Sequence, residues 1–366
     1  MLTMEKPFYP SEEDLANMCA EFGLQSWCLQ ETFRPVSVSK SLDEPLSNLT
    51  PELTVSGRQW LIQAPARAPI NAQSGLLHLG KNLLYESNPL NKDPEVRRWR
   101  RKGSMPPGWW HRSRYPNRSK KPLLLLSTHN NDNYFHWMTQ PGLAPLFLQD
   151  HFGLKPISGS ALGLSHRPRR SPPSYVSSLL GVFAPGVPLV QGISLASESI
   201  CRFALQEHTS DVVVSPAQLK WLNRRCCDQL QLSQKPWRRV LISRKLSNRR
   251  RCLNEDELFA ALSLYGFERY CLERLNVVQQ LRLFSESLLL VGAHGAGFSN
   301  LVACASQASI IELLPRPGSF SHYYVMADIL GLSHGHLLAS RFDSETDNFY
   351  INPSSLLQLL REMNLL

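Results

Sequence analysis

The stretch from Leu288 to Asn300, LLLVGAHGAGFSN, ends an apolar run with three glycines and one histidine. Glycines let backbone amides approach an anion closely, and a helix N-terminus directly after them adds unpaired N–H groups and a partial positive charge. The spacing of Gly292, Gly295 and Gly297 does not fit the GxGxxG fingerprint of dinucleotide-binding folds, and the stretch is not a nucleophile elbow. Taken alone, it fits either an anion site or a turn with a structural histidine.

Basic residues and one carboxylate follow two other apolar runs. Eight Lys and Arg lie between residues 235 and 251, among them Arg244, Lys245, Arg249 and Arg250, and Glu312 lies in SIIELLP. Guanidinium and ammonium groups neutralise a diphosphate leaving group, and a carboxylate accepts hydrogen bonds from ribose hydroxyls. Because the carboxyl ends of parallel strands meet at one edge of a sheet, we expect these groups and the 294–297 loop on one rim. The sequence therefore predicts a nucleoside diphosphate site.

The elements that position these residues alternate between strands and helices after about residue 235. Strands are expected at 239–243, 267–272, 288–292, 309–314 and 334–339, and helices at 255–265, 276–286, after Gly297 and at 321–331. Such alternation with short links predicts a parallel, doubly wound sheet. Asn254 is expected to cap the first of these helices through its side chain. Upstream, Leu123 to Ser127 is predicted as a buried strand, followed by a polar turn and a helix from about Tyr134.

Composition places the chain among globular proteins, since 366 residues with 43% hydrophobic content suffice for two domains. No run of about 18 apolar residues predicts a membrane span. The first residues lack the pattern of a secretory signal, and eight cysteines without a CxxC pair favour free thiols. We therefore expect a cytoplasmic protein, with peripheral attachment to the inner face of the membrane left open.

The net charge of +9 includes a basic cluster at residues 97–121, with ten Lys or Arg and no acidic residue. Tryptophans and a tyrosine are interleaved with these charges, which suits an anionic membrane surface or a lipid-diphosphate acceptor. A solvated loop is the alternative. Nucleic-acid binding would explain this cluster but not the predicted rim, so no nucleic acid is expected as a partner.

Taken together, the motifs resemble glycosyltransferase family 61 over roughly residues 120–340. The resemblance rests on VLISRKLSNRRRCLNEDEL, on LRLFSESLLLVGAHGAGFSNLVACASQASIIELLP and on the upstream NDNYFHWMTQPGLAPLF. Two departures from the family pattern are LAPL, which lacks the family's arginine, and ACAS, which lacks a glycine before IIE.

The resemblance implies an α/β fold of the GT-B type, with two Rossmann-like domains whose parallel sheets face each other across a cleft. On this basis we expect an N-terminal acceptor-side domain at residues 1–200, of which 1–90 match no motif. A C-terminal Rossmann-like domain that binds the nucleotide sugar is expected at 201–340. A C-terminal helix is expected within 341–366, with the N-terminal domain as one place for it to pack.

The resemblance also implies inverting, metal-independent transfer from a nucleotide sugar to a glycan or lipid-linked acceptor in cell-surface polysaccharide synthesis. No cofactor or metal is expected. The catalytic base is expected on the N-terminal side, with His136 preferred over Asp132. The structural alternative for His136 is packing beside Trp137, and the alternative for Asp132 is a role in the turn. The donor-binding residues carried over by motif are Arg244, Arg249, His294, Gly295, Gly297, Asn300 and Glu312. A family member that has lost catalysis and only binds glycans or partners remains an alternative.

Overall fold

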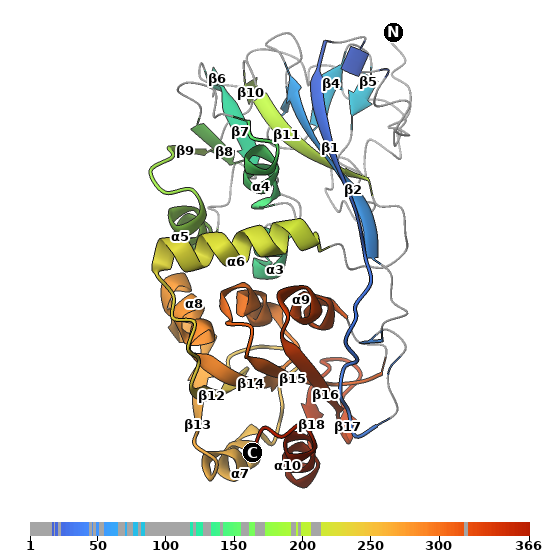
Figure 1. The fold of residues 1–366 in the computed structure, drawn as a ribbon, viewed down its shortest axis with the longest axis vertical. Coiled ribbons are helices and arrows are strands. Elements are labelled where there is room, and N and C mark those ends of the chain that lie inside the picture. The colour runs from blue at the N-terminus through green and yellow to red at the C-terminus, as the bar shows by residue number, and fades with distance from the viewer. Residues whose placement is uncertain are drawn as a thin grey trace. The chain divides into compact units, whose positions relative to one another are not determined.

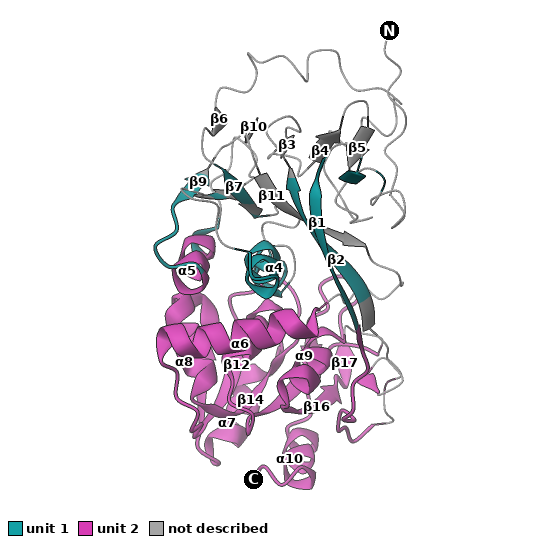
Figure 2. Ribbon diagram, turned by 45° about the horizontal axis from the view of Figure 1, so that its top comes forward, with its two compact units in different colours: residues 1–31, 56–174, 184–209 teal, residues 32–55, 175–183, 210–366 magenta. Residues whose placement is uncertain are grey.

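The structure of the protein is a computed structural model. It describes residues 17, 19–20, 23–43, 46, 49–50, 55–64, 70–71, 76–79, 82–84, 118–119, 122–126, 133–139, 142–154, 161–164, 173–191, 195–196, 199–205, 214–317 and 321–366. The chain divides into two compact units (Figure 2). Unit 1 comprises residues 1–31, 56–174 and 184–209, and unit 2 comprises residues 32–55, 175–183 and 210–366.

The sheet of unit 2 has five strands in the order β13-β12-β14-β15-β16 (Figure 1). Their bounds are β12 (Arg238–Ser243), β13 (Phe267–Cys271), β14 (Ser287–Ala293), β15 (Ser309–Leu314) and β16 (Ser333–Leu338). Every neighbouring pair is parallel. The parallel, doubly wound sheet predicted from the alternating pattern is therefore confirmed.

Helices cover both faces of this sheet (Figure 1). One face carries α8 (Val277–Ser285), the 3₁₀ helix η4 (Ala296–Ala303) and α9 (His322–Leu330), with α6 (Pro216–Leu230) packed over them. The other carries α7 (Glu255–Ser263) and α10 (Pro353–Glu362), and η3 (Leu272–Arg274) links β13 to α8.

Alternation along the strands separates a face that is apolar throughout from a face that also contains polar side chains. Leu289, Val291, Ile311, Leu313 and Leu337 enter one hydrophobic core together with the leucines of α7 and α10. Because successive side chains point to opposite faces, the residues between them face α8, η4 and α9. That second face holds His294, Glu312, His334 and His336, all of them buried. The polar residues at issue thus share one side of the sheet.

Two details of unit 2 differ from the sequence analysis. Asn254 precedes α7 but makes no capping hydrogen bond, because its side chain bonds the backbone of Ile351 through both Oδ1 (3.1 Å) and Nδ2 (2.8 Å). The helix after Gly297 is 3₁₀ rather than α. In addition, α10 packs within unit 2, against α7 and β16, because Leu356, Leu359 and Leu360 complete the apolar core there.

A strap of residues 36–40, from the opposite end of the chain, is part of unit 2. The backbone N–H groups of Val36 and Ser37 donate to the Asp328 carboxylate of α9, at 3.1 and 2.8 Å. Lys40 forms a parallel bridge with Gly335 and exchanges backbone hydrogen bonds with His334 (3.0 Å) and His336 (2.8 Å). The strap therefore extends the sheet beyond β16.

Unit 1 contains two sheets, and its strands are less regular. The larger has the order β1-β2-β11-β7-β8-β9, and the smaller has the order β5-β4-β3-β10-β6. The larger sheet comprises β1 (Gln25–Phe33), β2 (Val55–Ala64), β11 (Ser199–Leu205), β7 (Leu123–Leu126), β8 (Ala161–Leu164) and β9 (Leu189–Gln191). The smaller comprises β3 (Ile70–Asn71), β4 (Leu76–Leu79), β5 (Asn82–Leu84), β6 (Arg118–Ser119) and β10 (Leu195–Ala196).

The larger sheet of unit 1 is mixed, not parallel throughout as the sequence analysis expected. Strands β11, β7, β8 and β9 are parallel neighbours, but β2 runs antiparallel to β11. The predicted helix near Tyr134 is present as α3 (Tyr134–Thr139), followed by α4 (Ala144–His151), and α5 (Ser174–Phe183) comes between β8 and β9. Within the described residues, no helix has the length and apolarity needed to cross a bilayer.

Candidate functional site

The order of strands in unit 2 defines where a ligand is expected. The chain runs outward from β12 to β13 and then returns to β14 on the other side of β12. In doubly wound sheets, ligands bind beyond the carboxyl ends of the strands at this switch point. Arg244 follows β12 directly, and His294 and Gly295 follow β14 directly. Two of the predicted rim segments therefore meet at the switch point.

Arg244 lies against Gly295. A Cβ atom added to Gly295 would stand 1.8 Å from Nη1 and 2.8 Å from Cζ of Arg244. The backbone at Gly295 is extended, so the requirement for glycine here comes from space and not from an unusual φ angle. The absent side chain is thus what lets the guanidinium lie on the loop backbone.

The Arg244 guanidinium has few partners. Its Nη2 donates to Ser247 Oγ at 2.9 Å and to the Arg249 carbonyl oxygen at 3.1 Å, while the buried Nε has no hydrogen-bond partner among the described residues. None of the described carboxylates forms an ion pair with it. Burial, reinforced by the nearby charge of Arg250, lowers the pKa of Arg244 below its ordinary value. A half-buried cation that makes no salt bridge is suited to bind an anion.

His294 is held from behind by Glu312. Its Nδ1 forms a short hydrogen bond with Glu312 Oε1, and Glu312 Oε2 lies 3.3 Å from Nε2 of His334. Glu312 is 0% exposed. Burial raises the pKa of this carboxyl, but the charge of His294 and hydrogen bonds from both histidines outweigh burial and lower the pKa to about 2. The carboxylate therefore stays ionised and accepts from both rings.

This placement revises the role expected for Glu312. The sequence analysis put its carboxylate on the rim as a partner for ribose hydroxyls. In the structure both oxygens are occupied by histidines and buried in the middle of β15. The carboxylate thus contacts the rim only through His294.

The hydrogen-bonded chain continues to the strap. Ser39 Oγ lies 2.7 Å from Nδ1 of His334 and 2.8 Å from Nδ1 of His336, and all three side chains are buried. Burial lowers the pKa of His336 to about 4, so its ring is neutral at pH 7. We call His294, Glu312, His334, Ser39 and His336 the buried relay.

Tyr323 of α9 covers the loop end of this relay. Its ring lies 5.0 Å from the His294 ring and 5.4 Å from the Phe298 ring, centroid to centroid. Burial and the nearby Glu312 raise the pKa of its hydroxyl well above the ordinary value, so the side chain is neutral. The aromatic contacts fix the plane in which the imidazole lies.

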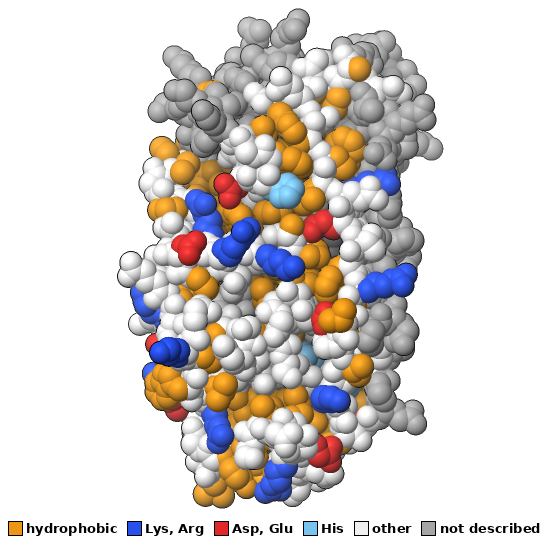
Figure 3. Space-filling model, in the orientation of Figure 1, with side chains coloured by type: hydrophobic (Ala, Val, Ile, Leu, Met, Phe, Trp, Pro, Cys, Tyr) orange, Lys and Arg blue, Asp and Glu red, His pale blue; other side chains and the backbone are white. Residues whose placement is uncertain are grey.

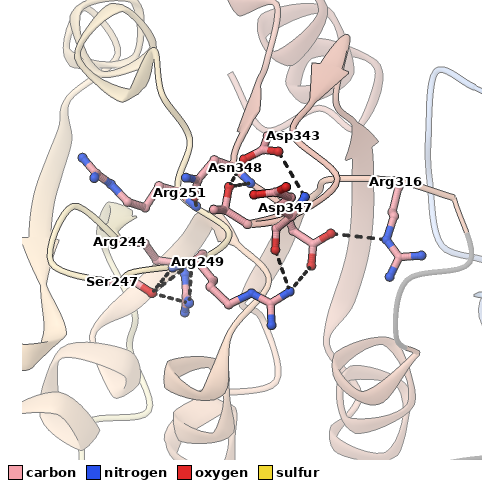
Figure 4. Close-up of polar contacts among 10 residues, drawn as sticks. Arg244, Ser247, Arg249, Arg251, Arg316, Asp343, Asp347 and Asn348 are labelled. Atoms are coloured by element: carbon pink, nitrogen blue, oxygen red, sulfur yellow. Dashed lines mark hydrogen bonds and ion pairs between the residues drawn. The ribbon is translucent and has the colours of Figure 1, made fainter.

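Arg249 turns away from Arg244, as Figure 4 shows. Its Nη2 lies 3.4 Å from the carboxylate of Asp347, and the same carboxylate lies 3.4 Å from Nε of Arg316. The Arg249 side chain is 62% exposed. Asp347 belongs to the loop between β17 (Arg341–Phe342) and β18 (Phe349–Tyr350). Only the backbone of Arg249, not its guanidinium, contacts Arg244.

Two other predicted donor residues, Gly297 and Asn300, make packing contacts and hydrogen bonds within the protein. A Cβ atom on Gly297 would stand 2.5 Å from Leu272 Cδ1, so this glycine allows close packing against η3. Asn300 is 0% exposed, and its Nδ2 donates to Gln280 Oε1 of α8 at 2.9 Å. Both residues hold η4 in place, and the Asn300 side chain is buried within the protein instead of lying at the rim.

The candidates for the catalytic base lie in or near unit 1. His136 is half-buried in α3, and its ring makes an edge contact with Phe135 at 5.4 Å. Asp132 and all but residues 118–119 of the basic cluster at 97–121 lie outside the described residues. In the described residues, no three His, Cys, Asp or Glu side chains are arranged to hold a metal ion.

Sequence reasoning missed Ser39, His334 and His336. The two histidines were signalled by their spacing of two in a predicted strand, which puts both side chains on one face of the sheet. The segment GLSHG around Ser333 also matches GxSxG, but it leads from α9 into β16, the reverse of the strand-to-helix order of a nucleophile elbow. No signal in the sequence pointed to Ser39, because its place depends on a contact across almost 300 residues.

A parallel α/β sheet with glycines and a cation at its switch point offers a place for a ligand beyond the ends of its strands. Residues 134–311 match the family model described as Glycosyltransferase 61. A stretch of 91 residues is 37% identical to the EGF domain-specific O-linked N-acetylglucosamine transferase of Drosophila melanogaster, and covers 23% of this chain and 18% of that protein. The matched residues make up just under half of the chain, so the similarity to glycosyltransferase family 61 is a property of this region. The chain aligns with less than a fifth of the length of the fly relative.

Proposed function

We propose that the chain is an inverting, metal-independent glycosyltransferase that uses a nucleotide sugar. The observation that carries this proposal is the contact of Arg244 with Gly295 beside His294, at the switch point of a sheet in a chain with a region similar to family 61. His136, Arg244 and His294 all lie within the matched residues 134–311. The GT-B arrangement of two facing domains is part of the proposal.

The donor diphosphate is placed at Arg244 and His294. In transfer, an acceptor hydroxyl oxygen bonds to the anomeric carbon, and the bond from that carbon to the diphosphate oxygen breaks with its electron pair on the oxygen. Arg244 supplies an unpaired guanidinium to this developing charge. His294, which Glu312 holds through its Nδ1 atom, is proposed as the second side chain that contacts the diphosphate.

His136 is proposed as the base that takes the proton of the acceptor hydroxyl, with Asp132 as the second candidate. A single displacement needs such a base, and histidine is the side chain most often used for it. The loss of a proton by the acceptor and the departure of the diphosphate then balance the reaction. His136 belongs to the first helix of the matched region.

The acceptor is proposed to be a glycan or lipid-linked sugar in cell-surface polysaccharide synthesis. Residues 97–121 are proposed to contact anionic lipid, and a cytoplasmic location at the inner face of the membrane fits this role. The fly relative, whose name specifies N-acetylglucosamine transfer to EGF domains, favours a second candidate in which the acceptor is a protein. A screen with N-acetylglucosamine donors and protein acceptors distinguishes the two.

Two alternatives carry less support. A member that has lost catalysis would bind nucleotides without transferring sugar, but Arg244, Gly295 and His294 retain the arrangement that transfer needs. A protein that binds nucleic acid is expected to have a continuous basic surface. On the face in Figure 3, the described Lys and Arg side chains are scattered, with Asp and Glu among them.

A thermal-shift screen of the full chain against nucleotides and nucleotide sugars tests the proposal. A ligand at 100 times its Kd stabilises the folded state by about 2.7 kcal/mol, which raises Tm by several degrees. We expect UDP or GDP and one of their sugars to do so, and sugar transfer or donor hydrolysis to follow. Binding without either reaction would support the inactive alternative, and no shift with any nucleotide would overturn the proposal.

A further inference from the structure

We propose that Ser39 is a positioning residue for the donor site, which it serves through His334 and Glu312 by fixing the hydrogen on His294. This inference deepens the proposed function and rests on it for the role of His294. Neither the family match, which covers residues 134–311, nor the glycine loop points to a residue this early in the chain.

The chemistry of the groups fixes the direction of the hydrogen bonds. An ionised Glu312 can only accept, so His334 must carry a hydrogen on Nε2 to bond Oε2. In the arrangement that we propose, Nδ1 of His334 then accepts the single hydrogen of the Ser39 hydroxyl at 2.7 Å. Because that hydrogen is used, Nδ1 of His336 must donate to the Ser39 oxygen at 2.8 Å. Hydrogens therefore point from His336 to Ser39, to His334 and to Glu312.

The far end of the relay disfavours the opposite direction. If His334 carried its hydrogen on Nδ1, the Ser39 hydroxyl would turn to His336, whose hydrogen would move to Nε2. That Nε2 atom is buried and has no hydrogen-bond partner among the described residues. Buried N–H groups without an acceptor are rarer in native structures than buried acceptors that lack a donor. We therefore assign the tautomers of His334 and His336 that leave this Nε2 atom without a hydrogen.

The strap is what brings Ser39 to the relay. Backbone bonds from Lys40 to β16 and the contacts of Val36 and Ser37 with Asp328 hold it on both sides of Ser39. Tyr324, whose hydroxyl donates to the Ser37 carbonyl oxygen at 2.6 Å, also lies against the His334 ring at 5.7 Å. The groups around His334 are therefore Ser39 of the strap, His336 of β16, Glu312 of β15 and Tyr324 of α9.

Ser37→Ala is a matched control for Ser39→Ala. Both serines lie in the strap, and both hydroxyls contact unit 2, but Ser37 bonds Asp328 at the surface of α9 while Ser39 bonds the two histidines. If Ser39 only fastened the strap, the two substitutions would have the same effect. Ser39→Thr retains the hydroxyl and should restore what Ser39→Ala loses.

The test is nuclear magnetic resonance of the full chain with ¹⁵N-labelled histidine, with signals assigned through His294→Gln, His334→Gln and His336→Asn. We expect the Nε2–H tautomer for His334 and the Nδ1–H tautomer for His336. Ser39→Ala should change the ring signals of His334 and shift the Nδ1 signal of His294, whereas Ser37→Ala and Ser39→Thr should not. Affinity for UDP or GDP should fall about fivefold in Ser39→Ala alone, as expected for one buried hydrogen bond.

The ring signals are read without nucleotide, so this test can fail separately from the proposed function. If no nucleotide binds but the tautomers and their response to Ser39→Ala are as stated, the proposed function fails while the positioning role of Ser39 stands. An Nδ1–H tautomer of His334, unchanged His294 signals in Ser39→Ala, or equal effects of Ser37→Ala and Ser39→Ala would overturn the inference.

Discussion

The Arg244 guanidinium occupies the space in which any side chain at Gly295 would lie, with Nη1 1.8 Å from the position of the missing Cβ atom. This contact joins the end of β12 to the end of β14, two strands that are neighbours in the sheet but are separated in the chain by β13 and α8. It gives a physical reason for glycine at position 295. It also means that a substitution at Gly295 can test the position of the guanidinium.

Gly295→Ala is expected to displace the guanidinium and lower affinity for UDP or GDP about tenfold, the effect of losing one charge-assisted hydrogen bond. The displaced atoms are the flexible end of a side chain, so Tm should change little. Isothermal titration calorimetry and thermal unfolding measure the two effects. In the double variant with Arg244→Ala, Gly295→Ala should cause almost no further loss of affinity, because the guanidinium that it displaces is absent.

The control for this loop change is Gly181→Ala in α5, where a Cβ atom would meet nothing within 4 Å. It should bind nucleotide as the wild type does. Wild-type affinity in Gly295→Ala as well would show that the position of Arg244 is irrelevant to binding.

The two arginines carried over by motif should differ in importance. Arg244→Ala is expected to weaken nucleotide binding about 10- to 100-fold, because this half-buried guanidinium has no competing carboxylate. Arg249→Ala should weaken binding less than fivefold, since its side chain is 62% exposed and lies beside Asp347. Calorimetry under identical salt conditions gives the comparison. A larger loss for Arg249 would mean that its side chain leaves Asp347 for the ligand.

His136→Ala should separate turnover from binding. Removal of a general base lowers turnover about 100-fold or more, while nucleotide affinity should stay within about twofold of wild type because the base acts on the acceptor. Transfer kinetics and calorimetry provide the two values. His151→Ala, at the exposed end of α4, is the matched control and should change neither. Equal losses of affinity and turnover in His136→Ala would contradict a role as base.

The buried relay should make stability depend on pH in two windows. Because the folded protein holds the pKa of His336 at about 4 against 6.5 when unfolded, the unfolded chain binds more protons between these values. Stability should therefore fall by roughly 3 kcal/mol as pH drops from 6.5 to 4. For Glu312, whose pKa is lowered, the stabilisation is present above about 4.5 and is lost as pH falls toward 2.

Urea unfolding of wild type and His336→Asn at several pH values isolates the first window. His334 and Glu312 face His336 and remain in the variant, while the asparagine amide can still donate to Ser39. The variant should lose clearly less stability between pH 6.5 and 4. Parallel curves for the two proteins would mean that His336 does not stay neutral in the folded state.

The fold of unit 2 could be predicted because its short strands alternate with helices, and β14 and β15 are nearly continuous apolar runs. The run from Leu288 to Gly292 is apolar on both faces, as a covered parallel strand must be, and it is present in β14. The antiparallel pairing of β2 with β11 could not be predicted, because it joins segments separated by almost the whole of unit 1. The side-chain cap expected at Asn254 was wrong for a similar reason, since Ile351 takes its amide.

The site was predictable only in part. The sequence indicates which residues lie near the ends of the strands, but not how deeply each side chain is buried. Sequence order puts Arg244, Gly295 and His294 at the ends of adjacent strands, where the structure also has them. Whether a residue near the rim faces solvent or the interior depends on the neighbouring helices, which a linear pattern does not contain. Glu312 and Asn300 therefore looked like ligand contacts, although both are 0% exposed and bonded within the protein.

Titration of UDP and GDP into wild type, Arg244→Ala, His294→Ala and Arg361→Ala tests the central claim most directly. Arg361 lies on α10 and bonds Tyr265 instead of the loop, so its removal controls for the loss of one positive charge. Wild type and Arg361→Ala should bind one of the two nucleotides with equal affinity, and the other two variants should bind it at least about tenfold more weakly. Unchanged nucleotide binding in both Arg244→Ala and His294→Ala would contradict a donor site at the switch point.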